Sequence, residues 1–207
     1  MKRLKNKLLK STKALNNKKK YKVGKADNIL LANIVDNLRK KPTENSFINF
    51  TNCLNFFYST RLQNAIDEKR HSLKTKSSVI YKVAKILENN WNNGLKLSEE
   101  YDGASINYKK VEGMRRLLKN ALNRNSYSFS TKVFHQLNNN YPILDFNVNK
   151  FMKANSFGKG INFYNEFRPY KIFYEEFLNM MGKIEWPLED VDGLDSAIWV
   201  FVNEGKN

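Results

Sequence analysis

One stretch of the sequence holds a lysine and an aspartate whose spacing could support covalent chemistry. Lys132 lies in the first turn of a short helix predicted from about Thr131 to Leu137, and Asp145 is placed to begin the next helix. The connection between them is short, so we expect both side chains to face the same cleft. A lysine is a nucleophile only when neutral, so burial or a neighbouring cation must lower its pKa from the usual value of about 10.4. His135, three residues after Lys132, is a candidate supporting residue.

The same stretch resembles the helix-hairpin-helix DNA glycosylases, most closely the bacterial branch that is similar to 8-oxoguanine DNA glycosylase. In that family a Thr-Lys-Val sequence opens the second helix of the hairpin and carries the catalytic lysine. A Pro-x-Asp sequence opens the next helix and carries the catalytic aspartate. Residues 131–133 read Thr-Lys-Val and residues 142–145 read Pro-Ile-Leu-Asp, with one extra residue before the aspartate. Weaker similarity extends to Asp195, Ile198 and Trp199 near the C-terminus.

The resemblance implies an enzyme that removes a damaged base from DNA, with an oxidised purine as the suggested target. Lys132 would attack the anomeric carbon of the sugar and release the base, and the Schiff base so formed would permit strand cleavage. Asp145 would stabilise positive charge on the sugar or accept a proton. The base must first be flipped out of the duplex, at a cost on the order of a few kcal/mol. The family's hairpin glycines have no counterpart in residues 125–130.

Helical spacing of apolar residues dominates the chain and indicates an all-α fold of about eight helices, without internal repeats. Asp27 is expected to cap the first of these helices, and Asp145 is expected to cap another. Pro169 suits the first turn of a further helix. The acidic loop around Glu99 and Glu100 is expected to be solvated, and Trp199 to lie in the core. Further helices are predicted over residues 45–71, 80–91, 111–122 and 194–202.

The net charge of +16 favours a polyanionic partner, nucleic acid first. The first 25 residues hold 11 basic residues and no acid, whereas the remainder carries only +5. We therefore expect a flexible basic arm over residues 1–25 and a single all-α domain over residues 26–207. Such an arm adds affinity by neutralising phosphates and releasing counterions. The predicted contacts with nucleic acid are Lys18, Lys19 and Lys20 in the arm, and Lys109, Lys110, Arg115, Arg116 and Lys119 on one helix.

Several classes of site are missing from the sequence. Cys53 is the single cysteine and only two histidines occur, which excludes an intrachain disulfide and a cysteine or histidine metal cluster. Neither a Gly-rich phosphate loop nor a nucleophile elbow is present. No apolar run approaches the ~20 residues that span a bilayer, and the N-terminus lacks the apolar core of a secretory signal. We expect no metal, no cofactor and no membrane contact. The expected location is the cytoplasm, with nucleoid association if the protein binds DNA.

Alternatives stay open at each position. Asp145 could serve only as an N-cap, Lys132 could be a solvated lysine, and His135 could be a hydrogen-bonded core residue. The basic clusters could be solvated faces. Two other functions therefore remain: a nucleic-acid-binding module of the same fold without catalysis, which the missing glycines favour, and a protein-interaction or defence-system component whose basic tail only aids solubility.

Overall fold

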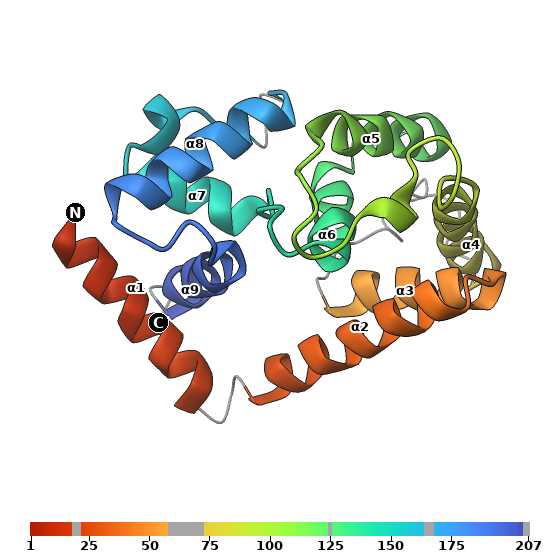
Figure 1. Ribbon diagram of the computed structural model, residues 1–207, viewed down its shortest axis with the longest axis horizontal. Coiled ribbons are helices and arrows are strands. Elements are labelled where there is room, and N and C mark those ends of the chain that lie inside the picture. Colours follow the sequence, from red (N-terminus) through yellow and green to blue (C-terminus); the bar gives the residue numbers. More distant parts are fainter. Residues whose placement is uncertain (18–21, 58–72, 124–125, 164–167, 205–207) are drawn as a thin grey trace. The chain divides into compact units, whose positions relative to one another are not determined.

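The computed structural model describes residues 1–17, 22–57, 73–123, 126–163 and 168–204. These residues form nine α-helices and two 3-10 helices and contain no strand, which confirms the predicted all-α class (Figure 1). The chain divides into two compact units. One comprises Ala26–Asn138, and the other combines Met1–Lys25 with Asn139–Asn207. The second unit is therefore built from both ends of the chain, which differs from the expected arm and single domain.

The unit of residues 26–138 is a helical cluster with a mixed aromatic and aliphatic core. Helix α3 packs on α4 and α6, and α5 packs on α4 and α6. At its centre Phe47 meets Trp91 edge to face, with the ring centroids 5.5 Å apart. Its helices are α2 (Lys22–Lys40, which starts before the unit), α3 (Glu44–Phe57), α4 (Leu73–Asn89), η3 (Leu97–Glu99), α5 (Tyr108–Leu122) and α6 (Tyr127–Leu137).

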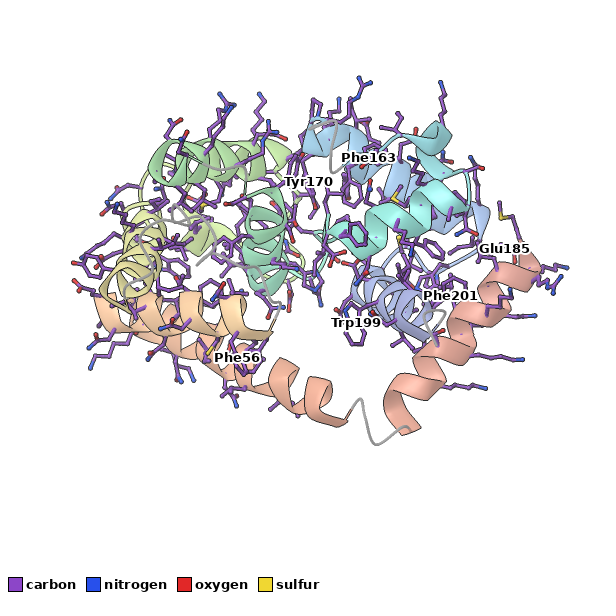
Figure 2. The ribbon with its side chains drawn as sticks, turned by 180° about the vertical axis from the view of Figure 1, so that it is seen from behind. Phe56, Phe163, Tyr170, Glu185, Trp199 and Phe201 are labelled. Carbon is purple, nitrogen blue, oxygen red and sulfur yellow. The ribbon has the colours of Figure 1, made fainter. Side chains whose placement is uncertain are left out.

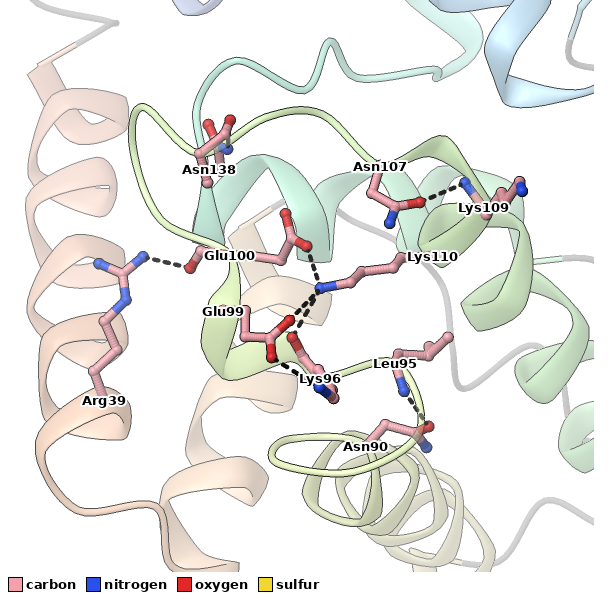
Figure 3. A network of polar contacts seen from close by, with 11 residues as sticks. Arg39, Asn90, Leu95, Lys96, Glu99, Glu100, Asn107, Lys109, Lys110 and Asn138 are labelled. Carbon is pink, nitrogen blue, oxygen red and sulfur yellow. Dashed lines mark hydrogen bonds and ion pairs between the residues drawn. The ribbon is translucent and has the colours of Figure 1, made fainter.

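The acidic loop between α4 and α5 is exposed at Glu99 and Asp102, as expected, but not at Glu100. Glu100 is 3% exposed, and its carboxylate lies 2.7 Å from the Lys110 ammonium of α5 (Figure 3). Arg39 of α2 donates hydrogen bonds to the main-chain oxygens of Glu100 and Leu137. Glu100 therefore sits in a polar network between the loop and the helices, because a buried carboxylate requires a nearby cation.

The unit that joins the two chain ends is organised around α9, which packs against both α1 and α7. Phe151 of α7 stacks with Phe157 and meets Phe201 edge to face, at centroid distances of 6.4 and 5.6 Å. The buried Tyr170 hydroxyl donates to the Pro142 carbonyl at 2.7 Å and so ties α8 to the segment before α7. The helices are α1 (Lys2–Asn17), α7 (Phe146–Ala154), η4 (Phe157–Gly160), α8 (Tyr170–Lys183) and α9 (Val191–Glu204).

The expected flexible arm is a helix over residues 2–17, and this helix packs on α9. Leu4 is half-buried, Leu8 is fully buried and Ser11 is 5% exposed. These positions repeat at intervals of four and three residues, so they fall on one face of the helix. Lys5 fixes the helix further by donating to the main-chain oxygen of Glu185 at 2.6 Å, beside the Glu185 carboxylate (Figure 2).

Several helix boundaries differ from the predicted ones. Helix α2 begins at Lys22, so Asp27 lies inside it rather than at its start. Helix α6 begins at Tyr127 instead of near Thr131. The end of the second predicted helix, from residue 58 onward, lies outside the described residues. Trp199 is 45% exposed, which contradicts its expected place in the core, because it lies beside the buried arc of α9 rather than within it.

A substitution in α1 distinguishes a docked helix from a loose arm. We expect Leu8→Ala to lower the free energy of unfolding by about 2–4 kcal/mol, because it removes buried apolar atoms and leaves a cavity. The exposed neighbour Leu9, which is 41% exposed, is the matched control. Leu9→Ala should change the free energy by less than about 1 kcal/mol in the same urea titration. Equal stability of both variants would contradict the docking of α1.

Candidate functional site

Lys132 lies in the second turn of α6 and is only 4% exposed. Every residue from Phe129 to His135 is buried. Hydroxyl groups reinforce the start of this helix: Ser130 donates to the Ser126 carbonyl at 3.0 Å, and Thr131 donates to the Ser128 carbonyl at 3.1 Å. Lysine is rarely buried, so the alternative of a solvated lysine does not hold. Such a lysine is a candidate for either an active-site group or a structural ion pair.

Asp145 is the N-cap of α7, as the sequence predicts. Its carboxylate oxygen Oδ1 accepts hydrogen bonds from the main-chain N–H groups of Asn147 and Val148, at 2.9 and 3.0 Å. The side chain is half-buried, and its backbone is extended, as an N-cap requires. The cap fixes the direction of the carboxylate and satisfies two amide groups that the helix leaves without partners.

The two candidate catalytic residues belong to different units: Lys132 to the unit of residues 26–138, and Asp145 to the other. Each is described within its own unit, and their sharing of one cleft stays a prediction. His135 is 5% exposed on α6, one turn after Lys132, which agrees with the core histidine that we considered. Its supporting role in catalysis also stays a prediction.

The basic cluster on α5 is partly committed to contacts inside the protein. Lys110 lies 2.7 Å from the Glu100 carboxylate and 3.5 Å from that of Glu99, and it donates to the Lys96 carbonyl (Figure 3). A phosphate would have to compete with these partners for Lys110. The same limit applies to Arg115, whose guanidinium is 2.7 Å from the Glu112 carboxylate.

Tyr127 holds Arg115 and Glu112 in place. The guanidinium of Arg115 lies 4.9 Å from the centroid of the Tyr127 ring, and the Tyr127 hydroxyl donates to Glu112 at 3.0 Å. Burial and the neighbouring Glu112 carboxylate raise the pKa of Tyr127, so this hydroxyl stays a donor. The remaining members of the predicted cluster, Lys109, Arg116 and Lys119, are exposed.

Helix α1 carries a cationic face that sequence reasoning did not assign. Opposite the face that packs on α9, the side chains are exposed and basic, and Figure 2 shows nitrogen-tipped side chains of α1 pointing away from α9. Among the described residues, no carboxylate forms an ion pair with any of them. They are Lys2, Arg3, Lys7, Lys10 and Lys13. The sequence does contain a pattern that indicates this face, because Leu4, Leu8 and Ser11 follow at helical spacing on the opposite side. The many lysines around them made the pattern hard to recognise.

The structure bears only in part on the remaining features that the sequence raised. Lys18, Lys19 and Lys20 lie outside the described residues. In the part of the chain that the structure describes, no three His, Cys, Asp or Glu side chains form a metal-binding group. None of its helices combines the length and apolar character that crossing a bilayer requires. Cys53 is partly buried, and this burial raises the pKa of its thiol.

Comparison of the chain with protein-family models, curated proteins and solved structures finds no match. The resemblance to the helix-hairpin-helix glycosylases therefore rests on residues 131–133 and 142–145 and on the weaker similarity near the C-terminus.

The capping role of Asp145 can be separated from any chemical role. Asp145→Ala should lower the free energy of unfolding by about 1 kcal/mol, because two amide groups lose their acceptor. Asp145→Asn keeps a capping oxygen and should stay within about 0.3 kcal/mol of the original protein. Urea titrations of both variants measure this difference. If Asp145→Ala has the same free energy of unfolding as the original protein, the cap contributes nothing to stability.

Proposed function

We propose that this protein binds nucleic acid, with DNA as the leading candidate, through the cationic face of α1. The observation that carries the proposal is that five exposed basic side chains project from one side of a helix that is anchored on its other side. From Lys2 to Lys13 the helix extends about 16 Å. Duplex DNA presents about ten phosphate charges over that length. A linear polyanion thus offers more than enough charge to neutralise this face.

The packing of α1 also favours nucleic acid over a membrane surface. A basic amphipathic helix binds a lipid surface by burying its apolar side among the acyl chains. In this protein that side is covered, since Leu8 is fully buried where α1 packs on α9. The cationic side is exposed, and phosphate contacts need no apolar insertion. The exposed Lys109, Arg116 and Lys119 of α5 add a further basic stripe, which supports the same class of partner.

We also propose a catalytic activity, base excision through Lys132 and Asp145, which is based on the family resemblance. The burial of Lys132 supports it, because lysine is rarely buried and a buried lysine is a candidate for an active-site group. Attack by Nζ on the anomeric carbon forms a C–N bond and breaks the bond to the base, which leaves with a proton. Asp145 would stabilise the cationic sugar. Collapse to a Schiff base would then allow strand cleavage.

A second candidate is binding without catalysis. The cap on α7 already gives the Asp145 carboxylate a structural role. Residues 127–130, where the family's glycine hairpin would fall, form the first turn of α6. Both observations favour a nucleic-acid-binding module that has no base-excision chemistry.

The binding proposal predicts a specific change in salt dependence. The triple variant Arg3→Gln, Lys7→Gln, Lys10→Gln removes three charges from the α1 face. If each contacts a phosphate, the slope of log K against log salt concentration for a DNA duplex should become shallower by about 2–3. Fluorescence anisotropy with a labelled duplex at several salt concentrations measures this slope.

The matched control removes the same charge elsewhere, with Lys41→Gln, Lys82→Gln and Lys183→Gln at exposed positions. It should leave the slope within about one unit of the original. Equal slopes for the two triple variants would contradict the proposal that α1 is the binding face. If the original protein fails to bind any duplex even in low salt, the interaction or defence-system alternative would be favoured.

The catalytic proposal predicts a covalent adduct. With sodium borohydride and a duplex that contains 8-oxoguanine, the protein should be trapped on the DNA through a reduced Schiff base. Lys132→Met, which keeps an unbranched buried side chain, should abolish the adduct, whereas Lys82→Met at an exposed site should not. Asp145→Asn should slow its formation. If the original protein forms no adduct, or if Lys132→Met forms as much, the protein is not a glycosylase of this type.

A further inference from the structure

The exposed face of α7 carries one aromatic side chain followed by two cations. Phe146, the first residue of the helix, is 61% exposed. Lys150 and Lys153 are exposed as well. These residues follow at intervals of four and three positions, so all three lie on one side of the helix. Along the helix axis the stripe is about 10 Å long.

This stripe lies outside the buried core of its unit. Helix α7 packs through the opposite side, where Val148, Phe151 and Met152 are buried. Phe151 makes ring contacts there with Phe157 and Phe201. Phe146 therefore exposes most of a large apolar ring away from this buried side. A single exposed apolar residue is ordinary in proteins, so the ring gains meaning only from its neighbours.

The neighbouring charges favour an anionic ligand. Within the described residues, neither Lys150 nor Lys153 forms an ion pair with a carboxylate. The nearest acid in the sequence is Asp145, whose Oδ1 accepts two main-chain hydrogen bonds at the start of α7. Hydrogen bonds of that kind partly offset the charge of the carboxylate. Further along α7, Lys150 and Lys153 place two positive charges on the C-terminal side of Phe146.

An aromatic ring beside cations is the combination that binds nucleic acid with unstacked bases. Each base can stack on the ring, which contributes about 1–3 kcal/mol, while the cations hold the phosphates on either side. An intact duplex keeps its bases stacked inside and offers the ring no free base face. The chemistry of the stripe thus fits a single strand, or a strand with one displaced base.

We propose that α7 binds an unstacked nucleotide, with Phe146 stacked on the base and Lys150 and Lys153 on adjacent phosphates. This inference rests on the proposed function, since it assumes a nucleic-acid partner, but it assigns a second surface with a different preference. Helix α1 would bind any phosphate backbone, whereas α7 would bind only where a base is free.

The test compares a labelled oligothymidylate with a mixed-sequence duplex in anisotropy titrations of the full chain. Phe146→Ala should weaken binding of the oligothymidylate about tenfold and leave duplex binding within about twofold. Phe146→Trp should retain the affinity for the oligothymidylate. The double variant Lys150→Gln, Lys153→Gln should make the salt slope for the oligothymidylate shallower by about 1–1.5. The control is Leu188→Ala, which removes another exposed apolar side chain, 59% exposed, from the same unit.

The outcomes separate this inference from the proposed function. Equal oligothymidylate affinity in Phe146→Ala and Leu188→Ala, with duplex binding intact, overturns the role of α7 alone. An equal loss of both nucleic acids in Phe146→Ala overturns the preference for unstacked bases. If the original protein binds neither nucleic acid, the proposed function fails and the inference fails with it. A selective loss of the oligothymidylate supports both.

Discussion

The packing of α1 on α9 is the contact on which the direction of the cationic face depends. It covers the side of α1 that holds Leu8 and joins the first residues of the chain to the last helix. Lys5 strengthens the contact by its hydrogen bond to the Glu185 carbonyl. Without this packing the basic residues of the N-terminus would be a tail with no defined direction. With it, they form a surface whose side chains point outward from a fixed helix.

The packing of α1 on α9 affects how its basic side chains can bind a partner. A disordered basic segment loses conformational entropy when it binds, and that loss lowers its affinity. In a helix that is already folded, most of this conformational entropy is lost when the protein folds and not when it binds. Its cations also keep a constant spacing, so they can engage phosphates along one line. The cationic face of α1 and the stripe on α7 both belong to the unit built from the two chain ends, and both helices pack on α9. The same helix thus supports two surfaces of different chemistry.

Local rules predicted those parts of the fold that depend on neighbouring residues in the chain. The cap at Asp145 follows from its place before an apolar helical pattern, and it is confirmed. The helical class follows from apolar spacing in the same way. Contacts between separate elements escaped prediction. Glu100 pairs with Lys110 of α5, which no local pattern reveals.

The N-terminal segment was misjudged because its apolar side consists of few residues among many lysines. Its helix is completed only by a partner near the other end of the sequence. For the candidate catalytic pair, the sequence indicated the residues and the cap. It could not indicate that Lys132 and Asp145 fall in different units, since that division depends on which helices pack together. The burial of Lys132 was likewise beyond local rules, because its helix is covered along nearly its whole length.

Lysine footprinting by acetylation and mass spectrometry can show whether α1 is a folded helix whose outer face contacts nucleic acid. The full chain is labelled with and without a DNA duplex. We expect Lys7, Lys10 and Lys13 to react readily in the free protein and to lose reactivity when the duplex is bound. The exposed Lys82, on α4, should react equally in both states. Unchanged reactivity of the three α1 lysines in a sample that binds the duplex would mean that α1 is not the binding face.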